Sequence, residues 1–334
     1  MSRLRKHQLF APIFLVLLLL VSCIGVVVSP VTLNSPLVEL VPIDVNPKDP
    51  GQKQFGALTV VSAFRLRSKD KRFGGLSGLV IGPDGKLYAV SDRGYWLSAN
   101  IRADQNGALT DLVNWQIAPM LTTGNMPVSE ELADAEALAL DRDGSFLVAF
   151  EGVHRIWRYA AAATFVSTPV PIPIPSAMRR APGNGGFEGL ATLPDGRLLA
   201  LTEEFANPDG SFKAWLFKNG GFAALSYLPA KGYHVSDCAA LSNGDVLVLE
   251  RRYVPLGIFS ARVTLVKAET IQPGAKLSGA ELLRLEQPLA VENYEGIAVQ
   301  QTAHGTMIFL VSDDNYSAFQ QTLLLQFLLP NTSN

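Results

Sequence analysis

The sequence predicts an all-β protein, a β-propeller of five four-stranded blades, from one repeated pattern and from the two ends of the repeat region. The pattern occurs five times, and its copies start at Ser77, Glu136, Glu188, Ser236 and Glu295. Each copy reads as a strand, a tight turn and a second strand, and four of the turns contain Asp-Gly or Asn-Gly. Such dipeptides between β-rich apolar runs are the strongest short-range hairpin signal. Successive starts lie 59, 52, 48 and 59 residues apart, a period that suits a propeller blade with variable outer loops.

The two ends of the repeat region supply the closure of the ring. The last copy is followed by one strand at 322–329, and the segment 57–66 is a lone strand with no hairpin of its own. Pairing these two strands leaves no open sheet edge, which is how propellers avoid edge-to-edge association. We therefore predict a single propeller domain over residues 55–330. Six blades are the alternative if the long connection 95–132 holds a degenerate blade, and a β-sandwich or a pair of barrels is another.

The first 28 residues have the form of an export signal or an N-terminal membrane anchor. Three basic residues within the first six positions precede an apolar run from Leu9 to Val28. Within this run, L-V-S-C at 20–23 resembles a bacterial lipobox, in which Cys23 would be lipidated. Residues 29–54 contain five prolines and are expected to form an extended tether. A lipid anchor, an uncleaved helical anchor and plain secretion all place the domain outside the cytoplasm, on the periplasmic or extracellular side.

Composition excludes several classes of protein. The chain has 28 Lys and Arg against 30 Asp and Glu and no basic block, so it lacks the clustered cations that nucleic-acid binding needs. Two cysteines exclude a disulfide scaffold and a multi-cysteine zinc site. With 48% hydrophobic and 17% charged residues, the chain is expected to build a large core, and we expect a monomer. The sequence contains no G-x-S-x-G nucleophile elbow, no Walker A loop and no H-E-x-x-H zinc motif.

Every copy carries polar residues at the open end of its hairpin, away from the turn. With two-residue type I′ turns, the predicted facing pairs are Ser77 with Asp92, Glu136 with Glu151, Glu188 with Glu203, and Ser236 with Arg251, while Glu295 and Asp313 correspond in the fifth copy. In a propeller these hairpin ends lie on one face, near the central channel. Facing carboxylates repel unless a cation, a shared proton or an arginine intervenes.

The sequence therefore predicts a ring of carboxylates that holds a divalent cation. The candidate metal ligands are Asp92, Glu136, Glu151, Glu188, Glu203, Glu295 and Asp313. Ligand sets made only of oxygen favour calcium or magnesium over zinc, and calcium is the cofactor that we expect. In the alternative interpretation the acids accept backbone N–H bonds or face water, and a one-residue bulge in any hairpin would break the predicted pairing.

Three arginines flank these acids and are the candidate substrate-binding residues. Arg93 follows Asp92, and Arg251 and Arg252 follow Glu250. Guanidinium groups bind carboxylates and phosphates through two parallel hydrogen bonds, so these arginines could hold the acids in place or bind an anionic substrate. Two histidines near the acidic strand ends, His154 and His234, are weaker candidates for a catalytic base.

At five motifs the chain resembles the phytase-like domain family, which is also described as having esterase-like activity of phytase. The motifs are G-G-L-S-G-L at 74–79, V-S-D-R-G at 90–94, G-F-E-G-L-A at 186–191, L-E-R-R at 249–252 and N-Y-E-G-I-A at 293–298. The resemblance covers roughly residues 55–329. It implies an exported bacterial β-propeller that hydrolyses phosphate or carboxylic esters, with a calcium dependence like that of propeller phytases. It implies no catalytic residue, so the acidic candidates rest on the repeat.

Taken with this resemblance, the sequence predicts an exported, membrane-tethered propeller hydrolase. Its carboxylates would hold a divalent cation, and its arginines would orient a small anionic ester. The alternative is a non-catalytic binding scaffold at the cell envelope, in which cations only hold the blades together. A sugar-lactone hydrolase of the six-bladed type is a more distant alternative, and the fold does not decide among the three.

Overall fold

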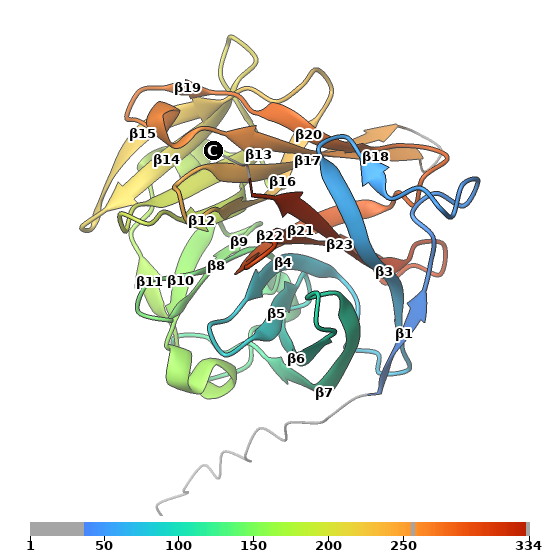
Figure 1. Ribbon diagram of the computed structural model, residues 1–334. Coiled ribbons are helices and arrows are strands. Elements are labelled where there is room, and N and C mark those ends of the chain that lie inside the picture. The colour runs from blue at the N-terminus through green and yellow to red at the C-terminus, as the bar shows by residue number, and fades with distance from the viewer. Residues whose placement is uncertain (1–36, 255–257, 332–334) are drawn as a thin grey trace, which may run out of the picture. The chain divides into compact units, whose positions relative to one another are not determined.

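Five sheets arranged as propeller blades make up the part of the chain that the computed structural model describes, residues 37–254 and 258–331 (Figure 1). Blade 1 consists of β4 (Leu76–Ile81), β5 (Lys86–Ser91), β6 (Tyr95–Ala103) and β7 (Leu109–Pro119). Blade 2 consists of β8 (Ala135–Leu140), β9 (Phe146–Phe150), β10 (Arg155–Tyr159) and β11 (Val170–Ile172). Blade 3 consists of β12 (Phe187–Thr192), β13 (Leu198–Ala206), β14 (Phe212–Lys218) and β15 (Gly221–Tyr227), extended by the short β19 (Lys276–Leu277).

The last two blades complete the ring. Blade 4 consists of β16 (His234–Ala240), β17 (Val246–Val254), β18 (Ile258–Val266) and β20 (Ala280–Leu285). Blade 5 consists of β21 (Asn293–Thr302), β22 (Gly305–Asp313), β23 (Thr322–Pro330) and β3 (Leu58–Ser68). The prediction of five blades is confirmed, and the connection 95–132 holds β6, β7 and a loop of blade 1 in place of a sixth blade.

The only helices among the described residues are short 3₁₀ segments. They are η1 (Glu130–Leu132), η2 (Ala161–Val166), η3 (Ser176–Arg180) and η4 (Ala268–Thr270). In this part of the chain no helix is long and apolar enough to cross a membrane. The expected leader, residues 1–28 with Cys23, lies outside the described residues.

The ring closes where the sequence predicts, by pairing a strand from each end of the repeat region. β3 pairs antiparallel with β23, with Leu66 opposite Thr322 and Ala63 opposite Leu325. The described part of the expected tether differs from an extended linker. Its strand β1 (Val38–Pro42) pairs with the other edge of β3, and β2 (Gln54–Phe55) pairs with the beginning of β3. Blade 5 therefore includes a segment that the proline content alone assigned to a tether.

The hydrophobic core is divided among the five spaces between neighbouring blades. One cluster of buried side chains lies in each space, including the space between blades 5 and 1. The innermost strands β4, β8, β12, β16 and β21 each contact the innermost strands of both neighbouring blades. Three residues from each of these strands, such as Leu79–Ile81 and Cys238–Ala240, line a central cavity of about 130 Å³. This arrangement brings one end of all five innermost strands together around the axis.

The four Asp-Gly and Asn-Gly turns differ from the predicted two-residue type I′ form. In the first, the N–H of Gly85 donates to the carbonyl of Gly82, and the N–H of Gly82 donates to Lys86, which closes a three-residue loop. Within this loop only Gly85 has a positive φ, of 73°, whereas a type I′ turn needs two such residues. The same hydrogen bonds and positive φ recur at Gly144, Gly196 and Gly244. Each longer loop shifts the pairing of its hairpin by one residue from the predicted register.

Candidate functional site

Each innermost strand has a β-bulge at the same position, near the open end of its hairpin. The register shifts between Ala135 and Ala137 in β8, and equivalent shifts occur in β4, β12, β16 and β21. The residues left unpaired in the last four blades are Glu136, Glu188, Ser236 and Glu295. A bulge leaves one residue out of the ladder and redirects its side chain, and bulges are frequent next to active sites. Three blades thus present a glutamate at the same unpaired position.

The bulges, added to the longer turns, change the predicted facing pairs. In blade 2 the N–H of Glu151 donates to the carbonyl of Asp134, so Glu151 lies opposite Asp134 and not opposite Glu136. The predicted facing pairs Ser77 with Asp92, Glu136 with Glu151, Glu188 with Glu203, and Ser236 with Arg251 are therefore wrong. The residues opposite Asp92, Glu203, Arg251 and Asp313 are Gly75, Gly186, His234 and Asn293 respectively.

The acidic residues nevertheless gather in one cluster, which we call the acidic ring. It contains the seven predicted ligands, Asp92, Glu136, Glu151, Glu188, Glu203, Glu295 and Asp313, together with Asp134. Carboxylate oxygens of Asp134, Glu136 and Glu151 lie within 4.8 Å of one another. The carboxylate of Glu188 interacts electrostatically with Glu136, Glu203, Glu151 and Glu295. The structure thus brings the predicted acids together, although not through the predicted cross-strand pairs.

Burial and mutual repulsion raise the pKa values of these carboxyl groups. Desolvation raises the pKa of Glu295 to about 8 and that of Glu151 to about 7, and it raises that of Asp92 to about 6. Desolvation, followed by repulsion from neighbouring carboxylates, also raises the pKa values of Glu136 and Glu188 well above the ordinary glutamate value. Perturbed carboxyl groups gathered in this way mark a candidate functional site.

Two carboxylates of the acidic ring have oxygens without a hydrogen-bond partner among the described residues, namely Asp92, at its buried Oδ1, and Glu188. The Glu188 side chain is buried, with the residue only 4% exposed, yet its carboxylate accepts no hydrogen bond from any residue in the described ranges. A buried carboxylate without a partner is costly unless a proton or a cation neutralises it. By contrast, Glu151 accepts hydrogen bonds from the backbone N–H groups of Gly185 and Gly186. The oxygen atoms around Glu188 form the kind of ligand set that calcium or magnesium prefers.

Arg251 is the cation of the acidic ring. Its guanidinium donates to Glu203 Oε1 at 2.8 Å and to Asn293 Oδ1 at 3.0 Å, and its Nε lies 3.1 Å from Glu295 Oε2. The carboxylates of Glu295 and Glu203 outweigh the effect of burial and raise the pKa of Arg251. Because these contacts occupy the guanidinium, Arg251 acts on the acids and has little capacity left for the predicted contact with substrate.

Arg93 and Arg252, the other two predicted substrate-binding residues, keep free guanidinium groups. Arg93 is exposed, and its guanidinium stacks 3.5 Å above the ring of Tyr316. Arg252 lies 5.0 Å from the ring centre of Tyr233. Within the described ranges neither guanidinium forms a hydrogen bond or an ion pair. Stacking on an aromatic ring orients a guanidinium and leaves its N–H donors available for an anion.

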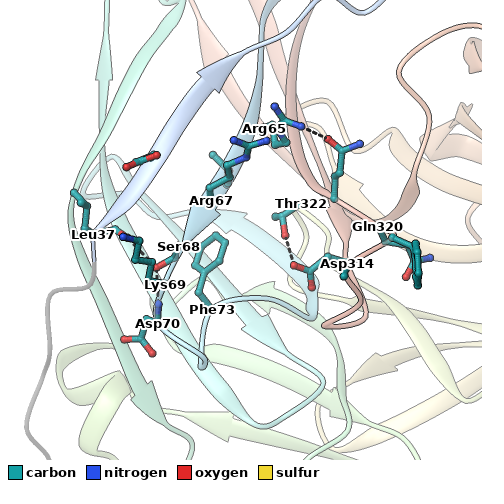
Figure 2. Close-up of a pocket in the computed structure, with 15 residues that line it drawn as sticks. Leu37, Arg65, Arg67, Ser68, Lys69, Asp70, Phe73, Asp314, Gln320 and Thr322 are labelled. Carbon is teal, nitrogen blue, oxygen red and sulfur yellow. Dashed lines mark hydrogen bonds between the residues drawn. The ribbon is translucent and has the colours of Figure 1, made fainter.

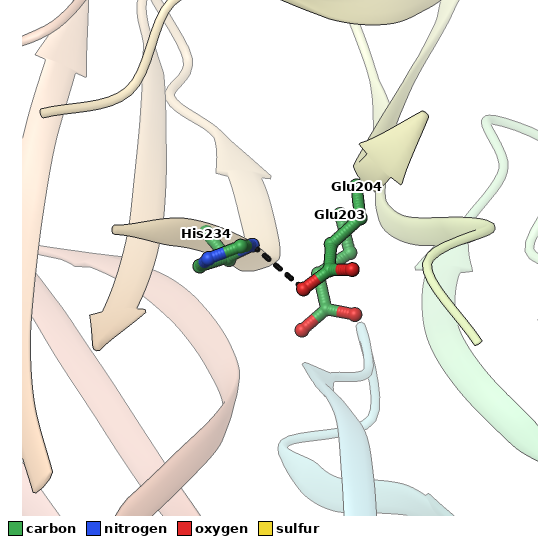
Figure 3. A group of neighbouring side chains, drawn as sticks. All are labelled: Glu203, Glu204 and His234. Atoms are coloured by element: carbon green, nitrogen blue, oxygen red, sulfur yellow. Dashed lines mark ion pairs between the residues drawn. The ribbon is translucent and has the colours of Figure 1, made fainter. Parts of the chain in front are cut away.

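A second group of possible ligands adjoins the acidic ring through Glu203. It consists of Glu203, Glu204 and His234, whose ligand atoms lie within 4.8 Å of one another (Figure 3). His234 Nδ1 lies 3.1 Å from Glu204 Oε1, and the imidazole stacks on Phe212. The Nε2 of His154 lies 2.7 Å from the carbonyl oxygen of Pro182, and its imidazole packs against Gly186, beside Glu151.

Sequence reasoning missed Asp134 and Glu204. Asp134 precedes the repeated pattern by two residues, and it faces Glu151 only because the bulge shifts the register. Glu204 follows a predicted ligand directly, and its contact with His234 joins blades 3 and 4, which no local pattern encodes. The acidity of both residues was the only signal that the sequence offered.

Another cavity lies beside β3 and approaches the acidic ring through Asp314, the neighbour of Asp313 (Figure 2). It measures about 790 Å³ and is lined by residues of β3 and of the 314–322 segment, among them Arg65, Arg67, Lys69 and Asp314. Its acid Asp70 is paired with Arg72, which lowers the pKa of Asp70. We assign the chemistry to the acidic ring because the raised pKa values and the unpartnered Glu188 occur there.

Comparison with known proteins identifies the family. The model of the phytase-like family, described as esterase-like activity of phytase, matches residues 71–316. The chain belongs to this family. The match includes every acid of the ring and all three candidate arginines of this phytase-like protein. A search of curated proteins finds no match.

Solved structures with some similarity to this phytase-like protein include several enzymes. The PQQ-bound aldose sugar dehydrogenase of Streptomyces coelicolor is 14% identical, with a TM-score of 0.47 over 80% of this chain and 98% of the other. A candidate gluconolactonase is 13% identical, with a TM-score of 0.45 over 90% of this chain and 93% of the other. The calcium-binding protein regucalcin of Agrobacterium tumefaciens is 12% identical, with a TM-score of 0.41 over 79% of this chain and 80% of the other. At such low scores these similarities carry no argument about activity, substrate or metal.

Proposed function

We propose that this phytase-like protein is a hydrolase of small anionic esters that depends on a divalent cation held in the acidic ring. The observation that carries the proposal is the buried Glu188 carboxylate, which accepts no hydrogen bond from the described part of the chain and lies among Glu136, Glu151 and Glu203. We expect Asp134, Glu136, Glu151 and Glu188 to hold the cation, with calcium as the first candidate. A bound divalent cation would supply Lewis-acid activation of the ester and of water.

The residues around the acidic ring have separate parts in this proposal. Arg93 binds the anionic group of the ester, because its guanidinium is exposed, is oriented by Tyr316 and forms no hydrogen bond or ion pair with the described residues. Arg252 is a second free guanidinium for the same purpose. Arg251 keeps Glu203 and Glu295 in place. The backbone N–H groups of Gly185 and Gly186 fix the carboxylate of Glu151.

We also propose that the protein acts outside the cytoplasm, held at the membrane by its N-terminal segment. The support is the basic and apolar pattern of residues 1–28 and the lipobox-like L-V-S-C that ends at Cys23. A radiolabelled palmitate experiment on the wild type and on Cys23→Ser would test this. Incorporation of labelled palmitate into the wild type but not into Cys23→Ser supports a lipid anchor. If neither protein incorporates the label, the lipid anchor is excluded.

A turnover experiment tests the catalytic proposal. Full-length protein is assayed on a panel of phosphomonoesters and carboxylic esters, with calcium or with a chelator, as wild type, Glu188→Gln and Glu131→Gln. Glu131 is the matched control because it is exposed and lies outside the acidic ring. We expect activity that the chelator removes and calcium restores, with Glu188→Gln weakening cation affinity by about 10- to 100-fold. If no ester is turned over with any cation, the hydrolase assignment is wrong.

The alternative function as a binding scaffold has its own structural argument. The acids of the ring come from different blades, so a cation held by Glu136 and Glu188 would also join blades 2 and 3. A scaffold would gain thermal stability from calcium and hydrolyse nothing. Measuring the melting temperature and the turnover on the same samples separates the two functions.

A further inference from the structure

Blade 4 departs from the acidic pattern of the other blades. At the end of the second strand, blades 1, 2, 3 and 5 carry an acid, namely Asp92, Glu151, Glu203 and Asp313. At the equivalent position blade 4 carries Arg251, and its bulge residue is Ser236 where blades 2, 3 and 5 have a glutamate. Blade 4 therefore replaces a negative charge of the ring by a positive one.

The guanidinium of Arg251 contacts the oxygen atoms that a cation would use. Its partners are carboxylate oxygens of Glu203 in blade 3 and Glu295 in blade 5, and the amide oxygen of Asn293. The Asn293 amide is fixed in turn, because its Nδ2 donates to Glu295 Oε1 at 2.7 Å. Carboxylate and amide oxygens are typical calcium ligands. The Glu203 and Glu295 side chains are 12% and 8% exposed, so their contacts with the guanidinium are largely shielded from water.

Six of the eight acids of the acidic ring form two groups, called halves here, with different neutralisation, and Asp92 and Asp313 belong to neither. In one half, Arg251 joins Glu203, Asn293 and Glu295 through contacts of 2.8 to 3.1 Å. In the other half, Asp134, Glu136 and Glu151 bring their oxygens within 4.8 Å of one another next to Glu188. No arginine or lysine of the described residues forms an ion pair within 4.0 Å with any of these four, and Arg251 acts on Glu188 and Glu136 only at longer range.

We propose that Arg251 is a built-in cation that takes the place of a second divalent ion, so that the acidic ring binds one divalent cation, in the half formed by Asp134, Glu136, Glu151 and Glu188. The inference rests on the proposed function in one respect, the binding of a divalent cation by the ring. It goes further by fixing the location and the number of cations and by assigning Arg251 a positioning role. A neutral residue at position 251 would leave Glu203, Asn293 and Glu295 as an open second site.

Calcium stoichiometry tests the proposal directly. Equilibrium dialysis with ⁴⁵Ca on the full-length protein compares the wild type with Arg251→Met, Arg251→Lys and the control Arg102→Met, which changes an exposed arginine on β6. We expect one calcium per chain in the wild type, in Arg251→Lys and in Arg102→Met, and two in Arg251→Met. If Arg251→Met folds and still binds one calcium, the proposal is overturned. Arg251 then only stabilises the contact of blade 4 with blades 3 and 5.

The same measurement separates this inference from the proposed function. A wild type that binds no calcium, with an Arg251→Met variant that binds one, would contradict the proposed function and the count of one cation, and would support only the replacement of a cation by Arg251. If neither protein binds calcium, both ideas fail. If Arg251→Met does not fold even in calcium, Glu203→Gln provides the second test. Because Glu203 lies in the half neutralised by Arg251, this variant should change calcium affinity less than about threefold, whereas a loss above tenfold would overturn the proposal.

Discussion

The carboxylate of Asp237, on the innermost strand of blade 4, accepts a hydrogen bond of 2.8 Å from the N–H of Ile297 on the innermost strand of blade 5. The same carboxylate accepts the N–H of Cys238, and the neighbouring Ser236 hydroxyl donates to the carbonyl of Tyr294. Asp237 is fully buried. Side chains therefore join blades 4 and 5 at the residue that follows the bulge.

We expect Asp237→Ala to destabilise this contact between the blades. The substitution leaves the N–H groups of Ile297 and Cys238 buried without an acceptor, and each such donor costs about 1–3 kcal/mol. The free energy of unfolding should fall by about 2–5 kcal/mol in urea denaturation. Glu131→Ala, at an exposed position, is the control and should stay within about 0.5 kcal/mol of the wild type. Equal stability of the two variants would show that Asp237 is not needed between the blades.

Blades 1, 3 and 5 have glycine at the position of Asp237 and blade 2 has Ala137, and among these glycines Gly78 in blade 1 is the most closely packed. A Cβ at Gly78 would lie 2.5 Å from the backbone nitrogen of Leu138 in blade 2. Backbone atoms cannot move aside as a flexible side chain can, so we expect Gly78→Ala to cost about 3 kcal/mol. Gly183→Ala is the matched control, because its Cβ would meet nothing within 4 Å, and it should change stability by less than about 1 kcal/mol. Thermal melts of both variants test this expectation. A Gly78→Ala variant with the melting temperature of the wild type would contradict the close packing of Gly78 against Leu138.

Stability without a divalent cation should fall as the pH rises. The pKa of Glu295 is raised by burial from 4.5 to about 8, so between these values the folded chain holds a proton that the unfolded chain has released. The unfolded state binds fewer protons in this range, and the free energy of unfolding therefore decreases with pH. In chelator, the melting temperature should fall from pH 5 to pH 8, and calcium should reduce the fall. Glu295→Gln should also reduce it, and a melting temperature that rises over this range would refute the argument.

Arg93 should determine the affinity for anionic substrates. If it binds the anionic group of the ester, Arg93→Gln removes a charge-assisted hydrogen bond worth about 1.5–3 kcal/mol. KM for an anionic ester should then rise by about 10- to 100-fold with kcat nearly unchanged, while a neutral ester should show no change. Arg102→Gln, an exposed arginine on β6, is the control. Equal effects on anionic and neutral esters would exclude this role for Arg93.

Much of the fold could be predicted from the sequence because the information is local. Asp84-Gly85 and its equivalents mark the hairpins, and a lone strand at each end of the repeat predicts the β3 and β23 pairing. The prediction failed where structure depends on longer-range packing. The bulge at Glu136 has no residue signature of its own, and β1 forms although prolines surround it.

In the acidic ring, too, the locally encoded features could be predicted from the sequence and the long-range contacts could not. The acids recur at fixed places in the repeat, so their convergence could be predicted. Their partners could not, because the contact of Arg251 with Glu203 and Glu295 joins three blades that are far apart in the sequence. The role of Arg251 therefore required the three-dimensional arrangement.

The pairing of β3 with β23 also determines when the molecule can finish folding. β3 is synthesised before the blades, yet its partner is the last strand of the described chain, so every other blade strand must be synthesised before the pair can form. Until then the edges of β3 and β22 stay unpaired, and the core clusters on both sides of blade 5 stay incomplete. A chain that stops before Thr322 would leave an open ring with a gap in its fifth blade. The unpaired edges of β3 and β22 could then pair with strands of other chains.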